Sequence, residues 1–180
     1  MNKEDLVLSL FFNEPTKHWH FEEVLRAAGI SRPQAARWLK IFFNGGLVKR
    51  TKPRGKLPYY LGNWQHPSYQ SRKRVFALNY FEEQGFLRHL AGLPKAKVVI
   101  LFGSLSRWDW HTDSDIDIFI FGDSTGFDRI KYRVNLGREI ETFICKDKEE
   151  LRKIPQSLMR NIAEGYLIKG TLDFLKVDYA

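Results

Sequence analysis

Two apolar runs around a short polar loop constrain the fold of this chain more than any other feature. Residues 97–103 read KVVILFG, and residues 115–121 read DIDIFIF, which alternates acid and isoleucine before it becomes wholly apolar. Runs of this kind predict strands that are buried in a sheet. The second run also places Asp115 and Asp117 beside a core, where carboxylates are costly unless something pairs with them.

Further strand and helix candidates alternate after these two runs. The other strand candidates lie at residues 139–145 and 166–170. The helix candidates lie at residues 127–136, 147–165 with a break at Pro155, and 171–176. This order predicts an α+β domain with a mixed sheet flanked by helices.

The N-terminal part has a different pattern, with three helix candidates followed by a hairpin. The helix candidates lie at residues 3–12, 20–28 and 32–43, with Asn2 and Ser31 as N-caps and Gly29 at the end of the second. Strand-like runs at residues 47–50 and 57–62 flank a Pro/Gly turn. The order resembles the winged helix-turn-helix domains of bacterial and archaeal regulators.

Positive charge is concentrated in this N-terminal part. Residues 1–75 carry 14 Lys and Arg against 5 Asp and Glu, a net charge of +9, whereas residues 76–180 carry 15 against 16, a net charge of −1. Such asymmetry indicates a polyanionic partner at one end of the molecule.

The third helix and the hairpin hold the candidate nucleic-acid contacts. Their polar side chains are suited to base edges and phosphates. On the helix these are Arg32, Gln34, Arg37 and Lys40, and on the hairpin Lys49, Arg50, Lys52, Arg54 and Lys56. DNA and RNA both remain open as the partner, and so does a protein-docking or dimerisation role for this domain.

The loop between the two apolar runs carries a candidate nucleotide site. Gly103-Ser104 follows directly on a buried strand, where glycine lets a phosphate approach the backbone, and Arg107 lies one turn further on. Asp115 and Asp117 share one face of a strand. Two carboxylates on one face repel each other unless a cation lies between them, and Mg²⁺ prefers such oxygen ligands.

These residues resemble a known signature. Gly103-Ser104, ten intervening residues and then Asp115-Ile116-Asp117 resemble the motif of the DNA polymerase beta-type nucleotidyltransferase superfamily. Gly-Ser-x-Ser-Arg, with Ser114 before the first Asp, is similar to its minimal nucleotidyltransferase branch. That branch usually has glycine after the Arg, where this chain has Trp108. Trp108 and Trp110 are expected either to stack on a base or to cover the core or an oligomer interface.

The resemblance implies a function and further residues. It implies a third carboxylate, for which Glu141 is the best match and Glu139 the alternative, although the family more often has Asp there. It implies one or two Mg²⁺ ions, held by Asp115, Asp117 and Glu141, and an NTP as substrate. Gly103, Ser104, Arg107 and Ser114 would bind the nucleotide. The acceptor would be an RNA or tRNA end or a partner protein, often in toxin–antitoxin pairs with a HEPN-type partner.

The sequence therefore predicts a winged helix-turn-helix domain over residues 1–66, a connecting helix over 67–92, either as one helix or as two with a bend at Gly85, and a nucleotidyltransferase domain over 93–180. The alternative is a DNA-binding regulator whose C-terminal domain only binds nucleotide. The single Cys145 allows no internal disulfide, and no apolar run approaches the length of a membrane helix. We therefore expect a cytoplasmic protein without a membrane partner.

Overall fold

The computed structural model describes residues 2–175, which fall into two compact units. The first unit contains the residues up to Phe76 and the loop Trp108–Thr112, and the second contains Ala77–Arg107 and the residues from Asp113 onward. The chain therefore leaves the first unit within helix α4 (Pro67–Glu83) and returns to it for a short loop. Within residues 2–175, no helix combines the length and the hydropathy that a membrane span requires.

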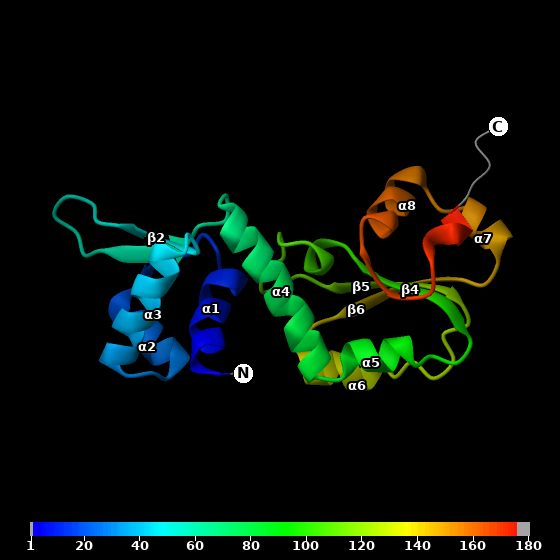
Figure 1. Ribbon diagram of the computed structural model, residues 1–180, viewed down its shortest axis with the longest axis horizontal. Coiled ribbons are helices and arrows are strands. Elements are labelled where there is room, and N and C mark those ends of the chain that lie inside the picture. Colours follow the sequence, from blue (N-terminus) through cyan, green and yellow to red (C-terminus); the bar gives the residue numbers. More distant parts are fainter. Residues whose placement is uncertain (1, 176–180) are drawn as a thin grey trace. The chain divides into compact units, whose positions relative to one another are not determined.

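Three helices, a small sheet and the first part of α4, as far as Phe76, form the first unit (Figure 1). Its elements are α1 (Lys3–Asn13), β1 (Trp19–His20), α2 (Phe21–Ala28), α3 (Arg32–Asn44), β2 (Val48–Thr51) and β3 (Tyr59–Gly62). The strands run antiparallel in the order β1-β3-β2. The side chains of the helices that face inward are fully buried, among them Val7, Phe11, Val24, Leu39 and Phe42.

Local chemistry fixes the ends of these helices. The side chain of Asn2 accepts a hydrogen bond from the backbone N–H of Asp5 at 2.8 Å, and Gly29 takes a left-handed conformation after α2. Ser31 is the N-cap of α3 and forms a capping box with Gln34, so all three expected caps are confirmed. The expected start of the second helix at residue 20 is wrong, because His20 has an extended backbone, pairs with Tyr59 and serves as the N-cap of α2.

A four-stranded mixed sheet forms the centre of the second unit. Its strands are β4 (Ala96–Phe102), β5 (Ile116–Gly122), β6 (Ile140–Cys145) and β7 (Tyr166–Lys169), in the order β6-β5-β4-β7. Strands β5 and β6 are parallel, and β4 is antiparallel to both β5 and β7. The four expected strands are therefore confirmed, with β5 beginning one residue after Asp115.

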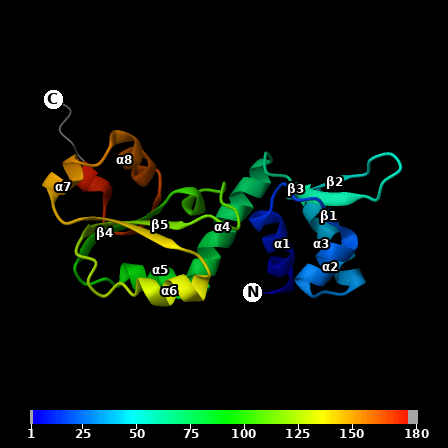
Figure 2. The same cartoon turned by 180° about the vertical axis from the view of Figure 1, so that it is seen from behind.

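Helices cover the two faces of this sheet (Figures 1 and 2). The helical elements are α5 (Phe86–Ala91), η1 (Ser104–Ser106), α6 (Arg129–Leu136), α7 (Lys148–Arg152), α8 (Gln156–Ala163) and η2 (Leu172–Leu175). Gly85 separates α4 from α5, and Pro155 separates α7 from α8, as expected. The last expected helix is only a 3₁₀ turn, and Lys176 lies outside the described residues.

Side-chain alternation assigns the strand residues to these two faces. One face buries a cluster with α7 and α8, whose members are Val98, Ile100, Phe102, Phe119, Phe121, Cys145, Leu151 and Ile162. Phe119 and Phe121 point to this face, so Asp117, two residues earlier, points there as well. Ile116, Ile118 and Ile120 are buried on the opposite face.

Candidate active site

Three carboxylates gather where the parallel strands β5 and β6 begin. Asp117 on β5 lies directly beside Glu141 on β6 in the strand register, and side chains so paired point to the same face of the sheet. Asp115 lies two residues before Asp117. Asp117 is half-buried, whereas Asp115 and Glu141 are exposed. The cluster therefore stands at the rim of the core, with one carboxylate partly withdrawn from water.

The pKa of Asp117 is raised because its carboxyl group is half-buried and the carboxylates are crowded together. Burial, together with the negative charges of Glu141 and Asp115, raises the pKa of Asp117 from 3.8 to about 6, although Arg107 opposes the rise. A carboxyl group surrounded in this way gains stability from a proton or from a cation. The three carboxylates therefore favour binding of a proton or a cation at this site.

Gly103 brings the end of β4 against Asp117. Phe102 pairs with Asp117 in the antiparallel register, so the turn at Gly103 falls next to the Asp117 side chain. Gly103 has φ of +71°, and a Cβ atom at this position would lie 2.0 Å from Oδ2 of Asp117. Only glycine fits here, because it has no Cβ and tolerates positive φ.

Ser104 begins the turn η1, and Arg107 follows directly after it. The hydroxyl of Ser106 and the backbone N–H of Arg107 donate hydrogen bonds to the carbonyls of Gly103 and Ser104, at 2.8 and 3.0 Å. Nη1 of Arg107 donates to Oδ1 of Asn161 on α8 at 2.8 Å. These bonds hold a guanidinium group close enough to Asp117 to influence its pKa.

Arg138 also belongs to this site, although no motif in the sequence predicts it. Its Nη1 donates a hydrogen bond of 2.7 Å to the backbone carbonyl of Ser114. Burial lowers the pKa of Arg138, while Tyr80, Asp113 and Asp115 favour its charged form. Arg138 thus fixes the backbone immediately before Asp115. The available signal was an arginine just ahead of a strand candidate that carries acids.

The two candidates for the third carboxylate differ in their surroundings. Oε1 of Glu139 lies 3.4 Å from Nη1 of Arg133 on α6, and both side chains are exposed. Glu141 is the acid aligned with Asp117 and the one that raises its pKa. The arrangement favours Glu141 over Glu139 as the partner of the Asp pair.

The donor set suits a hard divalent cation. In the described part of the chain, no three His, Cys, Asp or Glu side chains stand ready to hold a metal ion as they are placed. The carboxylates of Asp115, Asp117 and Glu141 are nevertheless oxygen donors of the kind that Mg²⁺ prefers. Burial and the negative charges of Glu141 and Asp115 raise the pKa of Asp117, and a cation beside these carboxylates would offset their repulsion.

The tryptophans of the intervening loop serve the first unit. Trp110 is buried, and its ring lies 6.3 Å from the ring of Phe12 and 6.4 Å from that of Phe76. The ammonium group of Lys73, itself buried, donates a hydrogen bond to the Trp110 carbonyl. Trp108 lines a cavity of about 170 Å³ in the first unit together with Lys73. Trp110 therefore covers a core.

The candidate nucleic-acid residues on α3 are partly engaged within the unit. Arg32 forms an ion pair with Glu22 at 2.5 Å, and the side chain of Gln34 accepts a hydrogen bond from the backbone N–H of Ser31. The guanidinium of Arg37 lies over the ring of Trp38, 5.3 Å from its centroid. Lys40 is exposed.

The basic residues of the hairpin all face solvent. These exposed side chains are Lys49 and Arg50 on β2, and Lys52, Arg54 and Lys56 around the turn. A backbone hydrogen bond from Lys56 to Pro53 closes that turn, in which Gly55 has φ of +72°. The hairpin thus presents a row of cations on a well-defined scaffold.

Comparison with known proteins supports a nucleotidyltransferase domain. Residues 87–172 match the family model described as "Polymerase beta, Nucleotidyltransferase". The match covers β4 to β7 and all three carboxylates, and it supports a nucleotidyltransferase activity in general.

One curated relative belongs to a different class of protein. The chain is 26% identical over 107 residues to NADH-cytochrome b5 reductase 2 of Kluyveromyces lactis. The aligned region covers 59% of this chain and 34% of that protein. The chain thus spans about a third of that relative's length, and the likeness carries no function to this chain. No solved structure matches the chain significantly.

Proposed function

We propose that this protein is a Mg²⁺-dependent nucleotidyltransferase that moves a nucleoside monophosphate from an NTP to a hydroxyl acceptor. The observation that carries the proposal is the in-register pair of Asp117 and Glu141, with Asp115 beside it and the Gly103 turn against it. The family match over residues 87–172 supports the reaction class.

Each residue of the site has a role in this proposal. Asp115, Asp117 and Glu141 would hold one or two Mg²⁺ ions, which would supply charge neutralisation for the triphosphate and the leaving pyrophosphate. Gly103 and Ser104 would admit a phosphate group to the backbone. Arg107, held by Asn161, would add a fixed positive charge, and Ser114, held by Arg138, would set the position of Asp115.

The first unit would serve as a winged helix-turn-helix domain that binds nucleic acid. Its three helices, its hairpin and its excess of positive charge support this role. DNA or RNA could occupy it, and an RNA end would also supply the acceptor hydroxyl. A HEPN-type partner in a toxin–antitoxin pair is the other acceptor that fits the minimal branch, and a cytoplasmic location suits both.

Label transfer tests the enzyme proposal. The full chain is incubated with Mg²⁺, each α-labelled NTP in turn, and cellular RNA or a HEPN-type partner protein. We expect label on one acceptor, its loss on chelation with EDTA, and its loss in Asp117→Ala. The matched control is Asp173→Ala, which removes an exposed acid near the end of the described chain and should leave transfer intact. Transfer that survives Asp117→Ala would exclude the carboxylate mechanism.

A second candidate is a DNA-binding regulator that binds nucleotide without turnover. The observation in its favour is that the acids, as placed among residues 2–175, do not form a ready metal group. This candidate predicts nucleotide binding, and tight salt-sensitive DNA binding, without label transfer to any acceptor. Equilibrium dialysis of α-labelled NTP, run beside the transfer assay, separates the two functions.

A further inference from the structure

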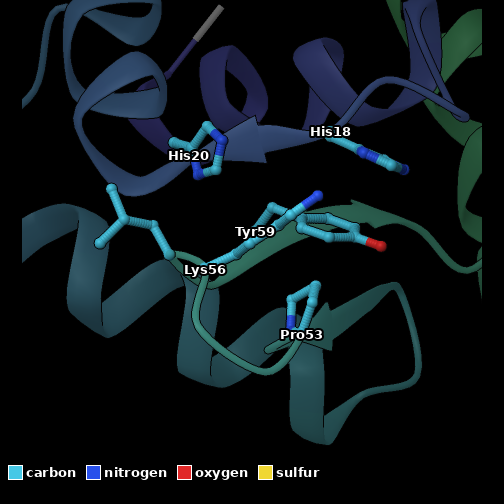
Figure 3. Close-up of a pocket in the computed structure, with 6 residues that line it drawn as sticks. His18, His20, Pro53, Lys56 and Tyr59 are labelled. Atoms are coloured by element: carbon cyan, nitrogen blue, oxygen red, sulfur yellow. The ribbon is translucent and has the colours of Figure 1, made fainter.

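A cavity of about 460 Å³ opens in the first unit, beside the turn of the hairpin. It is lined by His18, His20, Pro53, Lys56, Leu57 and Tyr59. Figure 3 shows the His18 and His20 rings on one side of the Tyr59 ring and Pro53 on the other, with the Lys56 side chain between them. Its volume falls in the range of small-ligand sites, roughly 300–1,000 Å³.

The polar groups of the cavity select for negative charge. Lys56 and the imidazoles of His18 and His20 line it, and no acidic residue does. Among the described residues, the ammonium group of Lys56 has no hydrogen-bond or ion-pair partner. Nδ1 of His20 lies 3.0 Å from the carbonyl oxygen of Pro58, so His20 is held in place as part of the wall. The cavity therefore offers a free cation on a firm frame.

The aromatic groups of the cavity select for a flat ring. The imidazole of His18 stacks on the phenol ring of Tyr59, with centroids 3.9 Å apart and planes 19° from parallel. The His20 ring meets Tyr59 edge-on at 6.4 Å. His18 is exposed, and Tyr59 is its one ring contact among residues 2–175. A planar group can stack on the outer imidazole face.

We propose that this cavity binds an unpaired nucleotide of a single-stranded nucleic acid. The base would stack on the His18–Tyr59 pair, and the adjoining phosphate would lie against Lys56. A base within a duplex has both faces covered and cannot enter, so the cavity favours a strand end or an overhang. The inference rests on the proposed nucleic-acid role of the first unit, and it names the class of nucleic acid that this unit prefers.

Binding measurements on the full chain test this preference. Fluorescence anisotropy compares a short labelled RNA strand with the same strand annealed to its complement, in EDTA and without NTP. We expect tighter binding of the single strand. His18→Ala should weaken single-strand binding by roughly ten-fold and leave duplex binding unchanged, because one base stack is lost. His18→Phe, which keeps a flat ring, should retain the preference.

Lys52 provides the matched control for Lys56. Lys52 lies on the same hairpin and is exposed, but it does not line the cavity. Lys56→Gln should weaken the single strand more than the duplex, whereas Lys52→Gln should weaken both equally. Circular dichroism checks that every variant is folded.

Three results would overturn the inference. They are equal wild-type affinity for single strand and duplex, a preference that survives His18→Ala, and competition by free AMP at the concentration where the RNA strand competes. The last result would assign the cavity to a free nucleotide. Because the assay contains neither Mg²⁺ nor NTP, its failure is distinct from a failure of the transfer reaction.

Discussion

At the residue scale, Gly103 is the position where a single methyl group decides the integrity of the site. Gly103 has φ of +71°, and Gly103→Ala would place Cβ 2.0 Å from Oδ2 of Asp117. Either the backbone at residue 103 or the Asp117 side chain must then move. We expect the free energy of unfolding to fall by about 3 kcal/mol and nucleotide transfer to be lost. Urea denaturation and the label-transfer assay measure the two effects.

Gly137 provides the control for this substitution. It has φ of +64° at the end of α6, but a Cβ there would meet no atom within 4 Å. Gly137→Ala should therefore cost only the backbone strain, about 1 kcal/mol, and transfer should persist. Gly103 has ψ of −159°, outside the left-handed region that Gly137 occupies, so a loss in Gly103→Ala no greater than the loss in Gly137→Ala would show that the contact with Asp117 adds no cost.

The raised pKa of Asp117 predicts that the stability of the folded protein depends on pH. Its pKa of about 6 in the folded protein is above its ordinary value of 3.8, so the folded state binds the proton more tightly than the unfolded state does. Stability is therefore lost as the pH rises from about 4 to about 6, and the loss persists above that range. Asp117→Asn should be more stable than the wild type at pH 7.5, by about 1 kcal/mol after allowance for partial exposure.

Thermal unfolding in EDTA at pH 4 and pH 7.5 measures this effect. The gain in Asp117→Asn should be present at pH 7.5 and nearly absent at pH 4, where the wild-type carboxyl is protonated. Asp173→Asn, at an exposed acid whose side chain accepts a hydrogen bond from Thr171, is the control and should give no gain in stability at either pH. A variant that is less stable than the wild type at pH 7.5 would contradict the crowding of Asp117.

At the scale of elements, Lys73 on α4 anchors the loop Trp108–Thr112. Its ammonium group donates to the Trp110 carbonyl and lies 4.4 Å from the centroid of the Trp110 ring. Lys73→Met should lower the free energy of unfolding by about 2 kcal/mol, because a buried carbonyl loses its partner. Amide hydrogen exchange over residues 108–112 should rise. Arg74→Met, at an exposed neighbour, should change neither quantity. Unaltered exchange in Lys73→Met would show that the aromatic contacts hold the loop without the lysine.

The elements also show how far the sequence predicts the structure. The strands of the second unit were predictable because continuous apolar runs such as residues 97–103 have few other stable positions. The two-residue strand β1 was not, since its pairing with Tyr60 and Tyr59 depends on residues far along the chain. The membership of loop Trp108–Thr112 in the first unit was hidden for the same reason.

The candidate site also has some features that the sequence predicts and others that it does not. The spacing of Gly103, Asp115 and Asp117 was sufficient to predict their proximity, because it follows from two adjacent strands. The alignment of Glu141, the hydrogen bond from Arg138 to Ser114 and the bond from Arg107 to Asn161 depend on side-chain packing between separate elements. Local pattern does not encode such contacts.

At the scale of the whole molecule, the uneven charge predicts where a polyanion binds. The net charge of +9 lies on residues 1–75, and the hairpin exposes Lys52, Arg54 and Lys56. Each phosphate contact releases counterions, so the logarithm of the binding constant falls with the logarithm of salt concentration. Replacing these three residues by Ala should reduce the magnitude of that slope by about 2–3, at roughly 0.7–0.9 per contact.

The control is a triple variant that removes three positive charges from the second unit. Lys146, Lys148 and Lys153 are exposed there, and their replacement by Ala removes an equal number of charges. Filter binding of labelled RNA and DNA over a range of salt concentrations gives the slope for both triple variants. The control should keep the wild-type slope, because contacts with individual phosphates are lost only at the hairpin. If both variants flatten the slope equally, net charge rather than the hairpin governs binding, and the assignment of the nucleic-acid surface to the first unit fails.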